Sequence, residues 1–373
     1  MTLFRHRFMS PTMPFDYSAV LSGKKRDPAS QILRVLLWLI SLVYQLVMRR
    51  RNQNYDSGRS PIHDAGIPVI SVGNLTTGGT GKTPIVCYLA GHLRERGVRV
   101  AIISRGYGRG EADANDEALE LYDRLPDVPH LQDPDRVASA KIAVEELGAE
   151  LLLMDDGFQH RRLKRDLDLV AIDATRPFGF GFCLPRGLLR EPVAALSRAD
   201  VVLLTRCDQV DRGQVEAIRQ QINRYAGDAL LVETKHVALG LFEYPGEFLE
   251  LRELDGARIA AVSAIGNPQA FEETLCEAGA QVIASRRLPD HDAFSPETVE
   301  MLREWVNGLG DSIDQVICTH KDLVKLQTDR LGGRPVRALQ IELVVEQGEG
   351  VLLGTLKTLL DPTAADSIGK DPV

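Results

Sequence analysis

The sequence predicts an α/β protein in which a doubly wound, mainly parallel sheet of the P-loop NTPase type is joined to a second, smaller α/β domain and to an N-terminal membrane-associated helix. Three observations predict this class. Short apolar segments alternate with segments of helical periodicity along most of the chain. A glycine-rich stretch lies between one such strand and helix. A long apolar run precedes both.

The glycine-rich stretch reads "SVGNLTTGGTGKTPIV" at residues 71–86. Residues 67–72 before it are mostly β-branched and uncharged, as in a buried strand, and residues 82–97 carry apolar side chains at helical spacing. Glycines let successive backbone N–H groups converge on phosphate oxygens, and a helix N-terminus favours an anion. The stretch therefore predicts a phosphate-binding loop. We expect nucleotide contacts from Thr76, Thr77, Gly78, Gly79, Thr80, Gly81, Lys82 and Thr83.

Two residues give this loop its expected chemistry. Lys82 is placed to reach the β- and γ-phosphates, and the Thr83 hydroxyl to join the Mg²⁺ shell. The chain departs from the general pattern at Thr76, where a glycine is usual. A glycine-rich turn followed by a chance Gly-Lys-Thr is the alternative, and the order of strand, loop and helix argues against it.

The overall composition excludes several classes of function. The 373 residues carry a net charge of −8, which does not favour non-specific binding of nucleic acid. The five cysteines are scattered without a C-x-x-C pair, so we expect reduced thiols, a cytosolic setting and no structural zinc site. No segment indicates an obligate protein partner.

Residues 32–51, "ILRVLLWLISLVYQLVMRRR", form an apolar run between two basic clusters. A polar stretch precedes it and no small-residue cleavage site follows, which argues against a secretory signal. Its apolar centre at 35–48 is shorter than the ~20 residues that cross a bilayer. One stripe of the helix is more polar: Arg34, Ser41, Gln45 and Arg49. We expect a helix lying in the membrane interface with basic residues on anionic headgroups. A helix buried in the protein core and a transmembrane span are the alternatives.

The remaining elements follow in order along the chain. Further buried strands are expected within residues 98–109, 149–160, 166–173 and 200–208, with an amphipathic helix at 133–148. Composition shifts toward extended strands and turns near residues 228–256, and strand–helix units restart at 258. The expected organisation is a polar extension at 1–28, a membrane-associated helix at 29–51, a nucleotide-binding domain at 52–231 and a smaller α/β domain at 232–373 that closes a cleft. In such sheets ligands gather at the carboxyl ends of the strands.

Asp155 and Asp156 close the apolar strand "LLLM". An acidic residue at this point is the usual second ligand to the Mg²⁺ of the nucleotide. Two adjacent aspartates exceed what one metal shell requires, so one of them is free to orient other groups. Which of the two contacts the metal is open, and capping of the following turn is the alternative role.

Three further segments carry candidate chemistry. Residues 176–192 form a long loop whose arginines suit an anionic substrate or the transferring phosphoryl group, or else a solvated surface. His291 lies between two carboxylates, an arrangement that suits proton transfer near neutral pH; a structural histidine is the alternative. Residues 205–208, "TRCD", differ from the guanine-reading [NT]-K-x-D pattern at Arg206, so GTP specificity has little support.

Taken together, these motifs resemble the tetraacyldisaccharide 4'-kinase family of the lipid A pathway. The matching segments run in order from about residue 29 to residue 326: "VGNLTTGGTGKTP", "SRGYGR", "NDEA", "DDGFQH", "RPFGFGFCLPRGLLREP", "PDH" and "THKDLVK". The family shares the non-glycine residue at the first loop position and the "DDGxQH" run.

This resemblance implies phosphorylation of the 4'-hydroxyl of a tetraacylated glucosamine disaccharide 1-phosphate by ATP and Mg²⁺, by direct in-line transfer. It implies a peripheral protein at the cytoplasmic face of the inner membrane. The nucleotide and metal residues would be Lys82, Thr83, Asp155 and Asp156, with Asp155 at the reacting phosphate and Thr83 and Asp156 at the metal. Asp116 would orient His291, which would take the proton of the hydroxyl. Substrate contacts would come from Arg105, Gln159, His160 and Arg190.

The chain also departs from the family pattern. Ala118 stands where a proline is usual, Asp292 where a second histidine is common, and Phe180 where an asparagine is common. A membrane-associated GTPase or ATPase switch that acts on a protein partner is the competing function, and a scaffold that binds nucleotide structurally is the other. Both predict nucleotide binding without transfer to a lipid.

Overall fold

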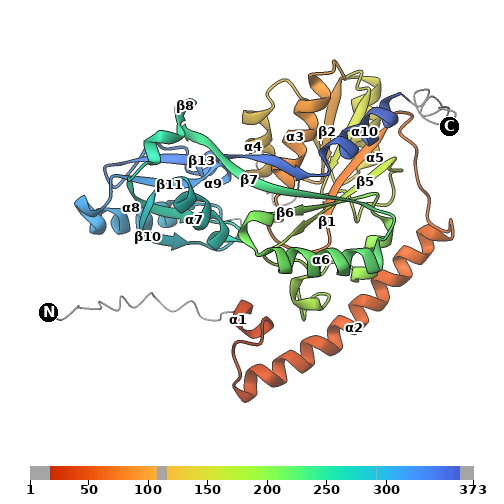
Figure 1. Cartoon of the computed structure of the whole chain (residues 1–373), viewed down its shortest axis with the longest axis horizontal. Coiled ribbons are helices and arrows are strands. Elements are labelled where there is room, and N and C mark those ends of the chain that lie inside the picture. The colour runs from red at the N-terminus through yellow and green to blue at the C-terminus, as the bar shows by residue number, and fades with distance from the viewer. Residues whose placement is uncertain (1–16, 107–115, 291, 362–373) are drawn as a thin grey trace.

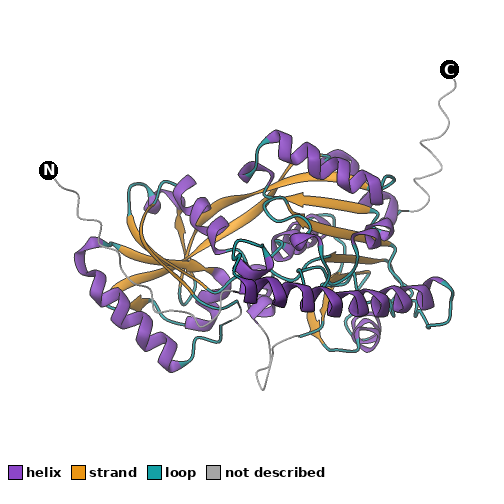
Figure 2. Cartoon of the chain, turned by 90° about the horizontal axis from the view of Figure 1, so that it is seen from below, coloured by secondary structure: helices purple, strands orange, loops and turns teal. Residues whose placement is uncertain are grey.

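The structure, a computed structural model, describes residues 17–106, 116–290 and 292–361. Two lobes lie side by side along the longest axis, and the long helix α2 (Pro28–Asp56) runs along the edge of the larger lobe (Figure 1). A single 13-stranded sheet passes through both lobes, with helices on its faces (Figure 2). The expected α/β fold class and the apolar N-terminal helix are therefore confirmed.

The larger lobe holds the nucleotide-binding type of sheet. Its parallel strands lie in the order β3-β2-β4-β1-β5-β6, so the chain winds outward in both directions from β1. These strands are β1 (Val69–Asn74), β2 (Val100–Ser104), β3 (His130–Gln132), β4 (Leu151–Asp155), β5 (Leu167–Asp173) and β6 (Val201–Thr205). The flanking helices are α3 (Lys82–Arg94), α4 (Asp116–Arg124), α5 (Arg136–Glu145) and α6 (Arg212–Tyr225). Helices on both faces explain why β1, β4 and β5 are buried along their whole length.

The smaller lobe repeats strand–helix units on the same sheet. Strands β9 (Arg258–Ser263), β10 (Gln281–Arg287) and β11 (Gln315–Thr319) are parallel, and α7 (Pro268–Glu277), α8 (Pro296–Leu309) and α9 (His320–Leu326) accompany them. Two long antiparallel strands, β7 (Leu230–Glu243) and β13 (Arg334–Gln347), join this part to β6. Short strands extend them, β8 (Glu247–Glu250) on β7 and β12 (Arg330–Leu331) on β13.

The last described helix, α10 (Glu349–Leu360), packs back onto the larger lobe. Its Leu352 and Leu356 share one apolar core with Ile85 and Leu89 of α3. The division expected at residues 231 and 232 stays a prediction, because β7 begins at Leu230 and continues the sheet across that point.

Helix α2 is longer than the sequence predicts, and only part of its polar stripe faces the protein. It begins at the N-cap Asp27, whose carboxylate accepts from the Ser30 amide, and a short helix α1 (Tyr17–Leu21) precedes it. Among the stripe residues, Ser41 is buried, Arg34 donates to the Lys25 carbonyl at 2.7 Å, and Arg49 is exposed. The expected contact of the basic residues with headgroups stays a prediction.

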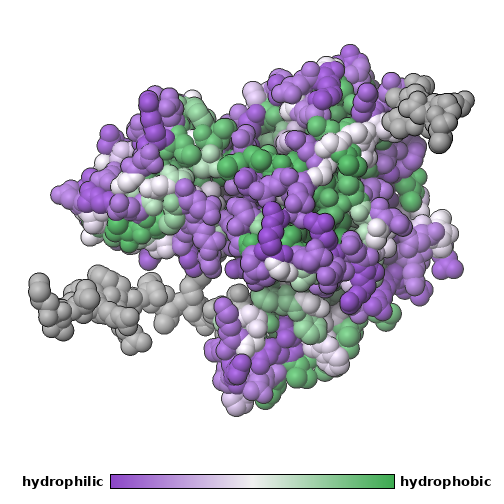
Figure 3. Space-filling model, viewed as in Figure 1, coloured by the Kyte–Doolittle hydropathy of each residue, from purple (hydrophilic) through white to green (hydrophobic). Residues whose placement is uncertain are grey.

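The outward face of α2 is apolar. Its exposed side chains are Ile32, Val35, Leu36, Trp38, Leu39, Ile40, Leu42, Val43, Leu46 and Val47. By length and composition the helix is sufficient to cross a membrane. Apolar side chains are visible along this edge of the molecule (Figure 3).

Candidate functional site

The loop after β1 has the conformation that its glycines allow. Gly78 has φ +107° and Gly81 has φ +81°, a region that side chains with a Cβ rarely adopt. A Cβ on Gly81 would also come within 2.6 Å of the His236 ring. Behind the loop, Asn74 Nδ2 donates to Thr80 Oγ1 at 2.9 Å and the Thr205 hydroxyl donates to the Thr80 carbonyl at 3.1 Å. These two hydrogen bonds anchor the loop to the ends of β1 and β6, and the other side of the loop is left facing a cavity.

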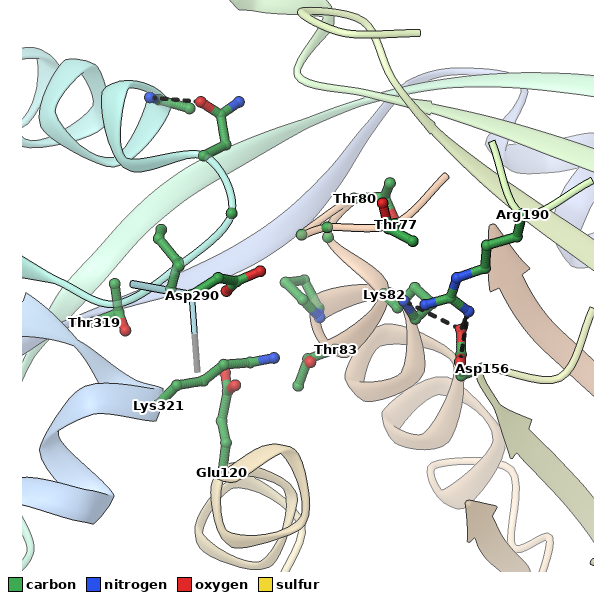
Figure 4. A pocket seen from close by; sticks show the side chains of 18 of the residues that line it. Thr77, Thr80, Lys82, Thr83, Glu120, Asp156, Arg190, Asp290, Thr319 and Lys321 are labelled. Carbon is green, nitrogen blue, oxygen red and sulfur yellow. Dashed lines mark hydrogen bonds and ion pairs between the residues drawn. The ribbon is translucent and has the colours of Figure 1, made fainter. Parts of the chain in front are cut away.

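The cavity has a volume of about 900 Å³ and lies between the lobes. The loop residues Thr77 to Thr83 form one wall, and the residues after β9 and at the start of α9 form the opposite wall (Figure 4). Helix α2 contributes the outer margin with Tyr44, Met48 and Arg51. One space therefore adjoins the phosphate loop, the smaller lobe and the apolar helix.

Asp156 is the carboxylate that faces this cavity. Arg190 Nη1 contacts both of its oxygens at 2.7 Å, and Lys82 Nζ lies 3.4 Å from Oδ1 (Figure 4). Burial by itself would raise the pKa of this carboxyl, but the charges of Lys82, Arg190 and Arg136 lower it below its usual range. Asp156 is therefore ionised at neutral pH.

Asp155 has a different environment. It ends β4, is 3% exposed and does not belong to the cavity wall. Its Oδ1 accepts from the Asp156 amide at 2.9 Å. Arg136, at the start of α5, donates to the carbonyl oxygens of both aspartates at 3.2 and 3.3 Å. Asp155 and Arg136 thus fix the turn that presents Asp156.

Most of the other expected site residues line the same cavity. Besides the loop residues, they are Arg105, Gln159, His160 and Arg190. Thr76 does not: it is 7% exposed and its backbone pairs with Leu189 of the 176–192 loop. Asp116 is the first residue of α4, but its side chain and His291 lie outside the described residues. Their pairing stays a prediction.

Gln159 and His160 lie where the turn after Asp156 meets the loop. Gln159 Nε2 donates to the Asn74 carbonyl at 2.9 Å, which joins this segment to the end of β1. Burial, together with the charges of Arg136 and Arg162, lowers the pKa of His160 to about 4. His160 is therefore neutral at physiological pH and suits hydrogen bonding to a hydroxyl rather than ion pairing.

Arg206, from the "TRCD" segment, makes its contacts with other residues of the protein. Its Nη1 lies 2.5 Å from Asp173 Oδ2 and 3.3 Å from the Gly79 carbonyl. In this geometry its side chain stabilises the phosphate loop, and the segment does not gain the lysine-type contact of a guanine-reading motif.

The structure also brings unpredicted residues to the cavity. Among them are Glu120, Arg136, His236 and Lys321. The sequence contains a signal for His236: it follows Val232 and Thr234 at every second position of strand β7, and these alternate positions face the protein interior. Arg136 stands one residue after an aspartate that caps a helix, a pattern that does not reveal its contacts in the tertiary structure.

The smaller lobe touches the phosphate loop directly. A Cβ on Gly266, in the loop after β9, would lie 2.8 Å from the Gly79 amide nitrogen. Next to it, the Asn267 side chain donates to Thr175 Oγ1 at 3.0 Å and Asn267 caps α7. The two lobes are therefore in close contact where a nucleotide would lie.

Comparison with known proteins agrees with this geometry. The sequence profile described as Tetraacyldisaccharide-1-P 4'-kinase matches residues 33–360. A tetraacyldisaccharide 4'-kinase from Anaeromyxobacter sp. strain Fw109-5 is 38% identical over 355 residues, with 91% of this chain and 95% of that protein covered. One from Geobacter sulfurreducens is 37% identical over 340 residues, covering 86% and 92%.

A solved structure is similar as well. It is the "apo" form of LpxK from Aquifex aeolicus in complex with ATP, which superimposes with a TM-score of 0.69 at 30% identity. The match covers 88% of this chain and 99% of that one. Since the family profile and relatives of this identity span nearly the whole chain, the chain belongs to the tetraacyldisaccharide-1-P 4'-kinase family, a family of lipid A kinases.

Proposed function

We propose that this chain transfers the γ-phosphoryl group of ATP to the 4'-hydroxyl of a tetraacylated glucosamine disaccharide 1-phosphate. The observation that carries the proposal is the shared cavity. Lys82 and Arg190 converge on Asp156 beside the phosphate loop, and the same cavity is bordered by Tyr44, Met48 and Arg51 of the apolar helix. A lipid held by α2 and a nucleotide held by the loop would thus meet in one place.

The phosphate site is strongly cationic, as in-line phosphoryl transfer requires. Lys82, Arg136, Arg190, Arg206 and Lys321 all line the cavity. Transfer of this kind depends on positioning and on neutralising charge on the phosphoryl oxygens, and fixed cations in a site with little water do both. We assign Lys82 to the β- and γ-phosphates and Arg190 to the transferring group.

The residues present also fit a Mg²⁺ ion. The Thr83 hydroxyl and the ionised Asp156 carboxylate are oxygen ligands of the type that Mg²⁺ prefers, and both face the cavity. Bound there with ATP, Mg²⁺ would supply charge neutralisation for the β- and γ-phosphates. Asp155, by holding the Asp156 amide, would keep the carboxylate in place.

A sugar hydroxyl is a poor nucleophile, so a base is needed near the acceptor. We assign this role to His291, oriented by Asp116, on the strength of the family motifs "PDH" and "NDEA". Arg105, Gln159, His160 and Arg190 are proposed contacts of the disaccharide substrate. The neutral His160 is suited to a sugar hydroxyl.

The proposed location is the cytoplasmic face of the inner membrane. The exposed apolar face of α2 would enter the interface, and Arg49 and Arg50 at the end of the apolar run are exposed for contact with anionic headgroups. The opposite face of α2 is hydrogen-bonded to the larger lobe, as with Tyr44 and Asn52, and this favours a helix that lies on the bilayer.

The test is transfer of label from γ-labelled ATP to a tetraacyldisaccharide 1-phosphate in detergent micelles. Labelled lipid is expected from the wild type and from Lys141→Ala, a control at an exposed lysine outside the cavity. None is expected from Lys82→Ala. Turnover of ATP or GTP by the wild type without labelled lipid would refute the proposal and favour a nucleotide switch.

A further inference from the structure

The inner face of α2 is attached to the residues that flank Asp156. Tyr44 Oη donates to the Arg190 carbonyl at 2.8 Å, and Asn52 Nδ2 donates to Glu191 Oε2 at 2.6 Å. Arg51 Nη2 donates to the Gln159 carbonyl at 2.7 Å. A helix needed only for membrane contact has no reason to bond to these particular segments.

From Tyr44 to the reacting centre the path is short. The carbonyl that Tyr44 holds belongs to Arg190, whose guanidinium contacts both oxygens of Asp156 at 2.7 Å. The Arg190 amide donates to the Leu75 carbonyl at 2.7 Å, at the entry to the phosphate loop. A shift of the Arg190 backbone would therefore move a cation away from Asp156.

The neighbouring Glu191 shows that this attachment is specific. Its carboxylate is completely buried and lies 3.1 Å from Arg198 Nη2, and Asn52 of α2 supplies its other partner. Loss of a partner would leave a buried charge uncompensated, which is strongly destabilising. The hydrogen bond from Asn52 to Glu191 therefore fixes the register in which α2 packs on the larger lobe. Tyr44 lies two turns before Asn52 on the same face of the helix and is placed by this register.

We propose that Tyr44 is a positioning residue for phosphoryl transfer: its hydroxyl holds the Arg190 backbone so that the Arg190 guanidinium stays on Asp156. Helix α2 thereby forms part of the catalytic apparatus in addition to its proposed membrane contact. This inference rests on the proposed kinase function. It also separates the two faces of α2, because Tyr44 faces inward and the apolar residues that would contact lipid face outward.

The test compares two substitutions that each remove one hydroxyl. Tyr44→Phe loses the bond to Arg190, and Tyr88→Phe, the control, loses a bond to Glu349 at 2.9 Å between α3 and α10. With saturating ATP and varied lipid in micelles, Tyr44→Phe is expected to lower kcat by ~3- to 10-fold with little change in KM for the lipid. Tyr88→Phe is expected to leave both unchanged, and Tyr44→Phe is expected to keep wild-type binding to vesicles of phosphatidylethanolamine and phosphatidylglycerol.

A double-mutant cycle then asks whether Tyr44 acts through Arg190. Arg190→Lys keeps the charge but shortens the reach to Asp156. If the effect passes through Arg190, adding Tyr44→Phe to Arg190→Lys should lower kcat by less than twofold further; independent sites would multiply their effects.

Each contrary result has a distinct meaning. A raised KM with unchanged kcat would make Tyr44 a lipid contact and overturn the inference, as would losses that multiply in the cycle. A kcat equal to that of Tyr88→Phe would also overturn it. In all three cases the wild type still labels the lipid, whereas a wild type that makes no labelled lipid would refute the proposed function itself and the inference with it.

Discussion

The exposed apolar face of α2 is expected to supply much of the free energy of membrane binding. Val43 and Leu46, on the same side of the helix, are 63% and 67% exposed. Complete burial of a side chain of this size contributes ~2 to 3 kcal/mol, so these two together would contribute ~3 kcal/mol on entering the interface. Replacing both with aspartate removes this contribution and adds repulsion from anionic lipid. Since about 1.4 kcal/mol corresponds to a tenfold change in a binding constant, the double variant should bind vesicles at least ~100-fold more weakly.

Co-sedimentation with vesicles of phosphatidylethanolamine and phosphatidylglycerol measures this change. Leu239→Asp with Ile283→Asp is the matched control, because it introduces the same two charges at exposed apolar positions away from α2, on strands β7 and β10. The control is expected to bind as the wild type does. In detergent micelles the α2 variant is expected to keep its kcat, since Tyr44 and Asn52 on the inner face are untouched.

Binding of the Val43→Asp, Leu46→Asp variant that equals the wild type would refute the reasoning, because it would show that the outward face of α2 does not contact lipid. An equal loss in the control variant would do the same, since the effect would then follow net charge alone.

Three other outcomes are expected. His291→Ala should lower kcat by ~10²- to 10⁴-fold, and an unchanged kcat in the labelled-ATP assay would remove His291 as the base. Gly266→Val should raise KM for ATP, because a side chain there meets the Gly79 amide; a KM equal to the wild type's would show that the lobes need not approach so closely. Burial raises the pKa of Asp322 to about 6, so the folded state holds this proton more tightly than the unfolded state does. Below about pH 4 this protonated carboxyl raises the free energy of unfolding by ~3 kcal/mol. That stabilisation should be lost as the pH rises from about 4 through about 6. Asp322→Asn should flatten this dependence in urea titrations, and an unchanged slope would assign it to other groups.

Sequence patterns predicted the larger lobe well because its signals are local. The phosphate loop follows from Gly78 and Gly81, which tolerate positive φ, and from Lys82 and Thr83 beside them. The buried strands follow from apolar runs too short for helices. Side chains that depend on a distant partner were harder to place: the sequence shows that Arg206 departs from the guanine-reading pattern, and only the structure shows that it pairs with Asp173.

The two adjacent aspartates show the same limit at closer range. The sequence marks both Asp155 and Asp156 as candidates, and they are chemically equivalent there. The structure separates them because the chain turns after β4 with Asp156 at φ +50°, which directs its carboxylate to Lys82 and Arg190 and leaves Asp155 behind the turn.

The sequence by itself therefore determined the fold class, the phosphate loop and the apolar character of α2, since each depends on neighbouring residues and on the periodicity of a single element. Only the tertiary structure decided which face of α2 meets the protein, which aspartate meets the cations, and that β7 and β13 carry one sheet through both lobes. These features depend on contacts between residues far apart in the chain, such as Tyr44 with Arg190, whose free energy exists only once the elements have packed together.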